Sequence, residues 1–329
     1  MNCEYEDKIF AVNSNTFEAT ALDVFRLQAA ENEVYRHFLQ ALQVDSSKVK
    51  RITDIPFLPV SMFKSFNVIT GSFEPEVVFE SSGTTGTVNS KHQVRKASVY
   101  RTSFMKTFQQ FYGAPADWCI LGLLPSYLER STSSLVFMVD ELIRNSEHEL
   151  SGFYLYEHAS LSDTLKSLIA AGQKTMLIGV SFALLDFGAA AGITLRNCIV
   201  METGGMKGRR AEITRSELHQ RIKNDFGISE VHSEYGMTEL LSQAYSTGNG
   251  IFTCPPWMKA IVRADDDPLA VSTSGKGLLN IIDLANIYSC SFIATDDIGV
   301  VHADGSFEVQ GRMDNSDVRG CSLMVSDMS

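Results

Sequence analysis

The stretch TMLIGVSFALLDFGAAAGITLRNCIVM, residues 175–201, decides the fold class of this chain. Its first six residues form an apolar run of strand length, residues 182–190 have the length of a short helix, and residues 198–201 form a second apolar run. Two apolar strands joined by a helix are typical of a parallel sheet, because parallel strands are buried on both faces and need a long crossover. The stretch therefore predicts a β-α-β unit.

The same alternation continues on both sides of this unit. Upstream, we predict a strand over residues 118–124 and helices over residues 132–145 and 161–171. Downstream, we predict a polar helix over residues 211–226 and a strand over residues 228–232. Repeated strand and helix segments predict an α/β fold in which helices cover a mostly parallel sheet.

The two ends of the chain differ from this middle part. Residues 16–42 carry apolar side chains at helical spacing, Pro56 and Pro59 then interrupt helix formation, and residues 77–79 predict a short strand. After Gly248, short β-like runs alternate with turns, at residues 260–263, 278–283, 290–294, 299–301 and 307–310. These runs predict a small antiparallel β subdomain from about residue 248.

The composition excludes several classes of protein. The 329 residues include 28 Lys and Arg against 39 Asp and Glu, and the net charge of −11 argues against nucleic-acid binding. Apolar residues make up 44% of the chain, which excludes global disorder. The most apolar stretch, residues 176–185, is far shorter than the roughly 20 residues that a membrane span needs. Since the first residues are also acidic, unlike a signal peptide, we expect a cytoplasmic protein without a membrane span.

The cysteines and histidines show no metal-binding pattern. None of the six cysteines forms a C-x-x-C pair, and no two histidines have the spacing of metal ligands. The sequence therefore argues against a metal ion that is held by the protein alone.

The segment ESSGTTGTVNSK, residues 80–91, has the composition of a phosphate-binding loop. Its glycines let the backbone approach a ligand, and its hydroxyls, backbone N–H groups and lysine favour an anion. It lacks the G-K-[ST] ending of a Walker loop, and a flexible polar loop is the alternative interpretation. The candidate phosphate-binding residues are Ser81, Ser82, Gly83, Thr84, Thr85, Gly86 and Lys91.

Two further motifs each follow a predicted strand. VHSEYGMTE, residues 231–239, ends in Thr238 and Glu239, a hydroxyl and a carboxylate suited to a phosphate and its Mg²⁺. ETGGM, residues 202–206, offers bare backbone on which a nucleotide base can lie. Each motif alone is equally typical of a turn.

Two motifs near the end of the chain add charged groups. TDDIG, residues 295–299, offers carboxylates for ribose hydroxyls, and GRMD, residues 311–314, offers a guanidinium. His92 and His232 flank the phosphate and adenine motifs. We interpret them either as positioning groups or as ordinary loop histidines.

Together and in this order, SSGTTG, GG, YGMTE, TDDIG and GRMD resemble the motifs of the adenylate-forming superfamily. That superfamily includes acyl-CoA synthetases, firefly-type luciferases and peptide-synthetase adenylation domains. A narrower resemblance is to the LuxE-type acyl-protein synthetases, whose best-known members supply fatty acid to a reductase in luminous bacteria. It is carried by PFLPVSMFKS (56–65), LPSYLERSTSSLVFMV (124–139), MKGRRAEITRSELH (206–219), EYGMTELLSQAYS (234–246) and GRMDNSDVRGCSLM (311–324).

The resemblance implies ATP and Mg²⁺ as cofactors. Residues 81–86 would hold the ATP phosphates, Thr238 would contact the α-phosphate, and Glu239 would bind the Mg²⁺. The other implied nucleotide-binding residues are Gly204, Gly205, Tyr235 and Gly236 at the adenine, Asp297 rather than Asp296 at the ribose, and Arg312 at the ribose or phosphate.

The resemblance also implies a domain organisation. Residues 1–310 would form the large N-terminal domain of an adenylate-forming enzyme, and residues 311–329 a hinge and a short C-terminal tail. The mobile C-terminal domain of the larger superfamily members, with its catalytic lysine, is expected to be absent or vestigial. Cys321 matches the cysteine on which acyl-protein synthetases hold their acyl group.

The implied activity is ATP-dependent conversion of a carboxylic acid, with a fatty acid favoured, to an acyl-adenylate. A thiol would then take the acyl group, either Cys321 or a thiol of an acceptor such as an acyl reductase or an acyl carrier protein. The candidate catalytic residues are Cys321, Thr238 and Glu239. The acid, the acceptor and the oligomeric state stay open, as does the ability to work without the mobile-domain lysine.

Two alternatives belong to other functional classes. The segment GVSFA, residues 179–183, approximates a nucleophile elbow, so Ser181 predicts either a hydrolase-like acyltransferase or simply a helix N-cap. The missing lysine leaves a non-catalytic nucleotide- or acyl-binding partner as the second alternative. Fluorophosphonate labelling would favour the first, and ATP binding without pyrophosphate exchange would favour the second.

Overall fold

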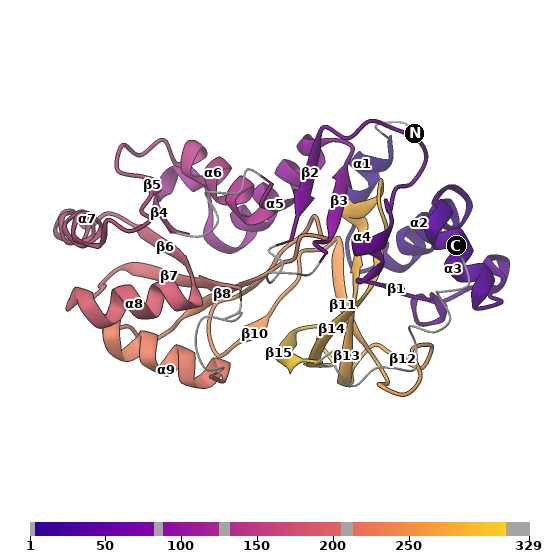
Figure 1. The fold of residues 1–329 in the computed structure, drawn as a ribbon. Helices are drawn as coiled ribbons and strands as arrows, with labels where there is room; N and C mark the ends of the chain where they lie inside the picture. Colours follow the sequence, from indigo (N-terminus) through magenta and orange to yellow (C-terminus); the bar gives the residue numbers. More distant parts are fainter. Residues whose placement is uncertain (1–3, 82–87, 125–131, 205–212, 314–329) are drawn as a thin grey trace.

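The computed structural model describes residues 4–81, 88–124, 132–204 and 213–313. The described chain is built around two large sheets, with α5–α9 around one and α1–α4 around the other (Figure 1). The predicted α/β fold class is therefore confirmed.

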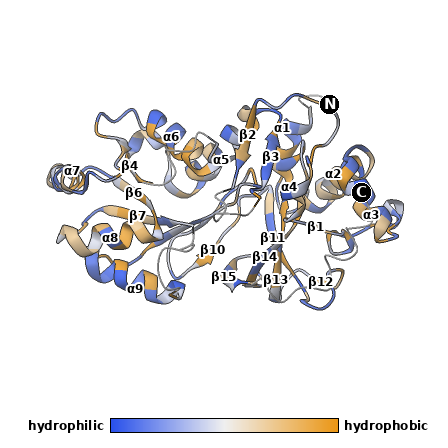
Figure 2. Ribbon diagram, in the orientation of Figure 1, coloured by the Kyte–Doolittle hydropathy of each residue, from blue (hydrophilic) through white to orange (hydrophobic). Residues whose placement is uncertain are grey.

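The first sheet comes from the middle of the chain. In spatial order its strands are β5 (Gly152–Phe153), β4 (Cys119–Leu123), β6 (Thr175–Val180), β7 (Cys198–Thr203), β8 (His232–Tyr235) and β9 (Ala244–Ser246). All neighbouring strands are parallel except the pair β8 and β9. Every residue of β4 and β6 is buried, as the apolar runs predict, and Figure 2 shows the hydrophobic character of these strands.

Helices cover both faces of this sheet. They are α5 (Ala97–Tyr112), α6 (Ser134–Ser146), α7 (His158–Ala171), α8 (Ser181–Ala191) and α9 (Arg215–Phe226). In Figure 1, α5 and α6 lie above the sheet and α8 and α9 below it. The predicted mostly parallel sheet with helical cover is confirmed.

The second sheet is antiparallel, apart from one short strand. It consists of β10 (Ile251–Phe252), β15 (Phe307–Arg312), β14 (Phe292–Val301), β13 (Gly275–Asp283), β11 (Met258–Arg263) and β12 (Val271–Ser272), with β1 (Leu58–Pro59) alongside β14. Pro59 was expected only to interrupt a helix, yet β1 pairs in parallel with residues 293–294. The runs predicted at 290–294 and 299–301 are one strand, because the polar TDDIG segment continues the ladder and a shift of register follows Ile298.

A two-stranded hairpin and several short helices complete the described fold. The hairpin strands β2 (Val77–Glu80) and β3 (Lys91–Val94) bracket the phosphate-loop motif. The remaining helices are α1 (Glu4–Phe10), α2 (Phe17–Glu31), α3 (Glu33–Ala41) and α4 (Met62–Ser65), with 3₁₀ turns at Ser46–Lys48, Ile52–Asp54, Pro115–Asp117 and Leu284–Asn286. Among the described residues, none of the helices has both the length and the apolar character needed to cross a bilayer.

Two helix predictions were wrong in their boundaries. The helix predicted over residues 16–42 is broken at Asn32, whose extended backbone caps α3 through a hydrogen bond from Tyr35 N. The helix predicted from residue 211 begins at Arg215, because Thr214 forms a capping box with Glu217.

Two elements of the first sheet also differ from the sequence-based prediction. The strand expected over residues 228–232 is β8, which lies three to four residues later. Glu234 and Tyr235 of the VHSEYGMTE motif therefore lie within the strand. No element was predicted for α5, whose aromatic residues pack against rings of other elements, such as Tyr100 against Phe79 and Phe137.

Candidate active site

The candidate site lies where the parallel strands β7 and β8 end. Thr203 on β7 pairs in register with Glu234 on β8. The residues that directly follow them, Gly204 and Tyr235, therefore lie next to each other at the same edge of the sheet. In open α/β sheets, ligands bind beside the carboxyl ends of the strands. The ETGG and YGMTE motifs therefore meet at a position where a ligand site is expected.

The segment that carries Thr238 and Glu239 is held by groups from distant parts of the chain. His92 Nδ1 donates to the Thr238 carbonyl at 2.8 Å, and Asn286 Nδ2 donates to the Glu239 carbonyl at 2.8 Å. Just beyond, the Asp283 carboxylate accepts from the backbone N–H of residue 241 at 2.7 Å and from the hydroxyl of residue 242 at 2.6 Å. These contacts fix the main chain around Glu239, whose side chain is buried at 6% exposure.

His92 is a neutral imidazole in this arrangement. Burial lowers its pKa to about 4, although the hydrogen bond to the Thr238 carbonyl opposes the shift. Because Nδ1 donates to that carbonyl, Nε2 carries the lone pair, and it is buried without a hydrogen-bond partner among the described residues. His92 therefore links β3, directly after the phosphate-loop motif, to the YGMTE segment, which favours the positioning interpretation.

Acidification is expected to destabilise the fold through His92. Its pKa is about 4 in the folded protein, against the ordinary histidine pKa of about 6.5 in the unfolded chain, so the unfolded chain binds more protons between these pH values. The free energy of unfolding therefore decreases by up to about 3 kcal/mol as the pH falls from 6.5 towards 4. Urea unfolding of the wild type and His92→Asn at pH 7 and pH 4.5 should show a smaller acid loss in the variant. An equal loss in both proteins would contradict this prediction.

Three of the predicted nucleotide-binding side chains gather beside the second sheet. The Tyr235 hydroxyl donates to Asp297 Oδ2 at 2.8 Å. Arg312, opposite Asp297 in the ladder, places Nε 3.9 Å from Asp297 Oδ1 and Nη2 3.9 Å from Asp296 Oδ2. The Tyr235 ring is 7% exposed and packs edge-on against Phe252 and Phe307. The structure therefore brings together a tyrosine hydroxyl, two carboxylates and a guanidinium.

Asp297→Ala is expected to weaken ATP binding more than Asp296→Ala. Asp297 accepts a hydrogen bond from the Tyr235 hydroxyl and is the residue expected at the ribose, whereas Asp296 lies 3.9 Å from Arg312 Nη2. A lost hydrogen bond to a charged group costs about 1.5–3 kcal/mol, or about 10- to 150-fold in affinity. Isothermal titration of both variants with ATP makes the comparison, and weaker binding by Asp296→Ala would shift the assignment by one residue.

The structure describes the flanks of the phosphate-loop motif. Ser81 N donates to Ser90 O at 3.0 Å, and Ser90 N donates to Ser81 Oγ at 2.9 Å, which closes the hairpin below the motif. Lys91 Nζ lies 3.4 Å from Glu80 Oε1. Residues 82–86, Gly205 and Cys321 lie outside the described residues.

Ser181 supports the glycine loop. Its hydroxyl donates to the Gly204 carbonyl at 2.7 Å and lies 3.4 Å from Glu202 Oε2. His219 Nε2 contacts Glu202 Oε1 and Ser233 Oγ, and no imidazole is among the described hydrogen-bond partners of Ser181. Ser181 is also not an N-cap, because Val180 occupies that position. The serine–histidine pair that a nucleophile elbow needs is therefore not formed among the described residues.

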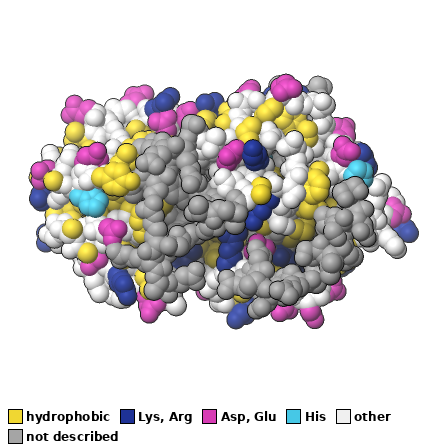
Figure 3. Space-filling model, viewed as in Figure 1, with side chains coloured by type: hydrophobic (Ala, Val, Ile, Leu, Met, Phe, Trp, Pro, Cys, Tyr) yellow, Lys and Arg dark blue, Asp and Glu magenta, His cyan; other side chains and the backbone are white. Residues whose placement is uncertain are grey.

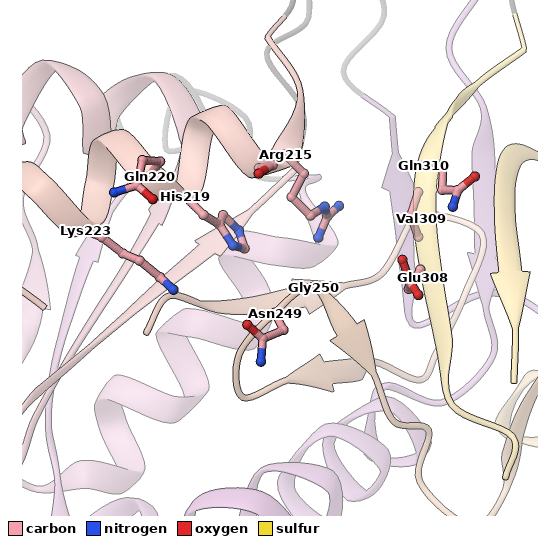
Figure 4. Close-up of a pocket in the computed structure, with 10 residues that line it drawn as sticks. Arg215, His219, Gln220, Lys223, Asn249, Gly250, Glu308, Val309 and Gln310 are labelled. Atoms are coloured by element: carbon pink, nitrogen blue, oxygen red, sulfur yellow. The ribbon is translucent and has the colours of Figure 1, made fainter. Parts of the chain in front are cut away.

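Glu202 is the charged residue next to Ser181 and contacts Arg215 and His219 of α9. Burial alone would raise its pKa, but the hydrogen bond from His219 and the charge of Arg215, whose Nη1 lies 3.2 Å away, outweigh burial and lower it. A pocket of about 400 Å³ lies beside this pair, between α9, residues 249–250 and β15 (Figure 4). Its lining is polar, with Arg215, Ser216, His219, Gln220, Lys223, Asn249, Gly250, Glu308, Val309 and Gln310.

Comparison with known proteins decides the family. A family model described as "Acyl-protein synthetase, LuxE" matches residues 7–328. The chain belongs to this family. The predicted family and enzyme class, an acyl-protein synthetase, are therefore confirmed.

Two curated relatives of this LuxE-family chain carry the name long-chain-fatty-acid–luciferin-component ligase. The protein from Vibrio harveyi is 23% identical over 90% of this chain and 83% of its own length. The protein from Aliivibrio fischeri is 23% identical over 93% of this chain and 86% of its own length.

Solved structures show a weaker similarity. O-succinylbenzoate coenzyme A synthetase (MenE) from Bacillus subtilis, in complex with AMP, has a TM-score of 0.48 at 18% identity, over 71% of this chain and 49% of that one. The N-terminal domain of FACL13 from Mycobacterium tuberculosis has a TM-score of 0.44 at 15% identity, over 74% of this chain and 62% of that one. The LuxE-family chain thus spans about half the length of the first of these structures.

Sequence reasoning missed the groups that hold the YGMTE segment in this LuxE-family chain. Asp283 and Asn286 lie in an apolar strand and the turn after it, and no local motif marks them. Burial raises the pKa of Asp283 to about 6, against the lowering effect of its hydrogen bonds. The signal available in the sequence was Asp283 itself, a carboxylate at the end of the largely apolar run at 278–283. An aspartate in such a run is rarely buried without a specific partner.

Proposed function

We propose that this chain uses ATP to convert a carboxylic acid, with a fatty acid favoured, into an acyl-adenylate and then passes the acyl group to a thiol. In the first step a carboxylate oxygen of the acid bonds to the α-phosphorus of ATP, the bond to the bridging oxygen breaks, and pyrophosphate leaves. In the second step a thiolate bonds to the acyl carbon and AMP leaves with the electron pair of the broken C–O bond. The products are a thioester, AMP and pyrophosphate.

The observation that carries the proposal is the rigid support of the Thr238–Glu239 segment beside the carboxyl ends of β7 and β8. His92, Asn286 and Asp283 hold its main chain, so a hydroxyl and a carboxylate are preorganised where a phosphate would lie. Preorganised groups act on developing charge without a reorganisation cost during the reaction. The family of the chain and the names of its curated relatives support the same reaction class.

Mg²⁺ fits these residues by the chemistry of their donors. Glu239 and Thr238 supply oxygen ligands, which Mg²⁺ prefers, and a buried carboxylate is stabilised by a cation. Within the described ranges, no group of three or more His, Cys, Asp or Glu side chains is placed to hold a metal. We therefore assign Glu239 to a Mg²⁺ that arrives with ATP and neutralises phosphate charge there.

The remaining roles follow from the gathered side chains. Asp297 would bind the ribose hydroxyls with Tyr235 and Arg312 beside it, because carboxylates accept strong hydrogen bonds from hydroxyls. Ser181 would position Gly204 at the adenine through its 2.7 Å bond to the glycine carbonyl. The acceptor thiol would be Cys321, a thiol of an acyl reductase or acyl carrier protein, or both in turn, in the cytoplasm.

Pyrophosphate exchange tests the proposal directly. Wild-type protein with ATP, Mg²⁺ and labelled pyrophosphate should incorporate label into ATP only when an accepted acid is present. A screen of fatty, aromatic and amino acids identifies that acid. If the protein binds ATP but shows no pyrophosphate exchange with any acid, the proposal is wrong and the protein is a non-catalytic nucleotide-binding partner.

A further inference from the structure

A row of polar side chains crosses the first sheet directly beside the candidate site. Thr203 on β7 pairs in register with Glu234 on β8, and Glu234 pairs in register with Tyr245 on β9. Residues paired across neighbouring strands project from the same face of a sheet. Thr203, Glu234 and Tyr245, here called the polar row, therefore lie side by side.

The polar row faces α5. The Tyr245 ring packs against Phe111 and Tyr112, with ring centroids 5.4 Å and 5.3 Å apart. Tyr100, in the first turn of α5, accepts a hydrogen bond from Gln243 Nε2 at 3.2 Å. In Figure 1 this is the face of the sheet on which α5 and α6 lie.

Two members of the polar row have unmet hydrogen-bonding capacity. Thr203 Oγ1 and the Tyr245 hydroxyl are buried without a hydrogen-bond partner among the described residues, and so is Oε1 of the adjacent Gln243. Thr203 and Tyr245 are each 1% exposed. Native proteins pair about 90% or more of such groups, and each unpaired group costs about 1–3 kcal/mol. These unpaired oxygens, on the two strands that flank β8, indicate that another group completes their bonds.

Glu234 connects the row to the candidate site. Its carboxylate overlies Gly236 so closely that a Cβ on that glycine would collide with Oε1. Burial, and the charge of nearby Glu202, raise the pKa of Glu234 to about 8. This shift favours the protonated carboxyl group, which both donates and accepts hydrogen bonds.

The distance from the reaction centre is short. Thr203 directly precedes Gly204, and Glu234 lies two residues before Gly236, whose backbone its carboxylate contacts. The Tyr235 side chain, between them, projects to the other face of the sheet. A group bound at the row would thus lie beside the Gly236 backbone, where the YGMTE segment leaves β8.

We propose that the polar row is a subsite for a hydroxyl group on the acid substrate, at its second or third carbon. The proposal rests on the function proposed above and names the class of acid, a hydroxylated fatty acid. A hydroxyl both donates and accepts, and it matches a row made of two hydroxyls and a carboxyl group, with the Gln243 amide oxygen next to it. A chain without a hydroxyl group would leave these oxygens unpaired, and sites built to bind a substrate hydroxyl reject analogues without one.

The experiment compares matched acids. Pyrophosphate exchange is measured with decanoic, 2-hydroxydecanoic and 3-hydroxydecanoic acid, and kcat/KM is compared. We expect at least one hydroxy acid to exceed decanoic acid about tenfold or more. Decanoic acid equal to or better than both hydroxy acids would overturn the subsite, because the row would then hold only buried water.

Two variants tie the preference to the row. Tyr245→Phe and Thr203→Val each remove one hydroxyl that has no hydrogen-bond partner in the described ranges, so neither is expected to lower the melting temperature. Each should reduce kcat/KM for the preferred hydroxy acid severalfold more than it reduces kcat/KM for decanoic acid. An unchanged preference in both variants would also overturn the proposal.

Tyr112→Phe is the matched control. The Tyr112 hydroxyl contacts His232 Nδ1 at 3.1 Å, and Tyr112 packs against Tyr245 without belonging to the row. Its removal should leave the hydroxy-acid preference intact. The experiment distinguishes failure of the two proposals. If no acid supports pyrophosphate exchange, the proposed function is wrong. If exchange occurs without a preference for hydroxy acids, only the subsite is wrong.

Discussion

Glu239→Gln is expected to reduce pyrophosphate exchange by about 10²-fold or more while leaving the fold intact. The amide keeps the size of the side chain and its place in the buried segment but removes the charge that Mg²⁺ requires. The main-chain bond from Asn286 to the Glu239 carbonyl is unaffected by the substitution, so the segment keeps its position. The expected loss is therefore chemical rather than structural.

The control for this variant is Glu230→Gln. Glu230 is exposed and forms an ion pair with Lys223 at 3.1 Å, so the substitution removes the same charge outside the candidate site. Exchange rates of both variants are measured at several Mg²⁺ concentrations, and circular dichroism checks the fold. Exchange by Glu239→Gln within tenfold of the wild type would remove Glu239 from the metal site.

The architecture around this site could largely be predicted, because its signals are local. The buried strands β4 and β6 are continuous apolar runs, and the helices between strands have the expected length and polarity. Charged side chains of both signs lie across the described part of the face in Figure 3, as the mixed composition leads one to expect. Boundaries failed where one residue decides them, as at Asn32 and at the Thr214 capping box.

In the candidate site, too, the local features could be predicted and the long-range contacts could not. The residue types of YGMTE, TDDIG and GRMD are visible as motifs, and the structure brings Tyr235, Asp297 and Arg312 together. The groups that hold the Thr238–Glu239 segment come from elsewhere in the chain. His92 is 146 residues from Thr238, and Asn286 is 47 residues from Glu239. A single sequence contains no signal for these two contacts, because they depend on how the β2–β3 hairpin and the turn after β13 pack against this segment.

The same limit applies to the polar row. Thr203, Glu234 and Tyr245 are ordinary residues in their own strands, and only the register of β7, β8 and β9 aligns them. The strand predicted over residues 228–232 would have left Glu234 outside the sheet. The difference of a few residues in β8 therefore decides whether the row exists.

Cys321→Ser is expected to keep pyrophosphate exchange and to lose acyl transfer to the natural acceptor. Cys321 lies outside the described residues, so the prediction rests on its match to the family and on its neighbour Arg319, since a nearby cation lowers a thiol pKa. The described cysteines are poor candidates, because burial raises the pKa of each one: to about 12 for Cys198, Cys254 and Cys290, and upward also for Cys119. A protonated thiol is a weak nucleophile.

Cys3 is the remaining cysteine, and Cys3→Ser is the matched control. After incubation with ATP, Mg²⁺ and an accepted acid, mass spectrometry should find a hydroxylamine-labile acyl group on the peptide that contains Cys321. The adduct should persist in Cys3→Ser and vanish in Cys321→Ser, because serine lacks a thiolate and its hydroxyl is a far weaker nucleophile. If Cys321→Ser transfers acyl groups as well as the wild type, the adenylate is attacked directly by the acceptor's own nucleophile, and the enzyme acts without a covalent intermediate.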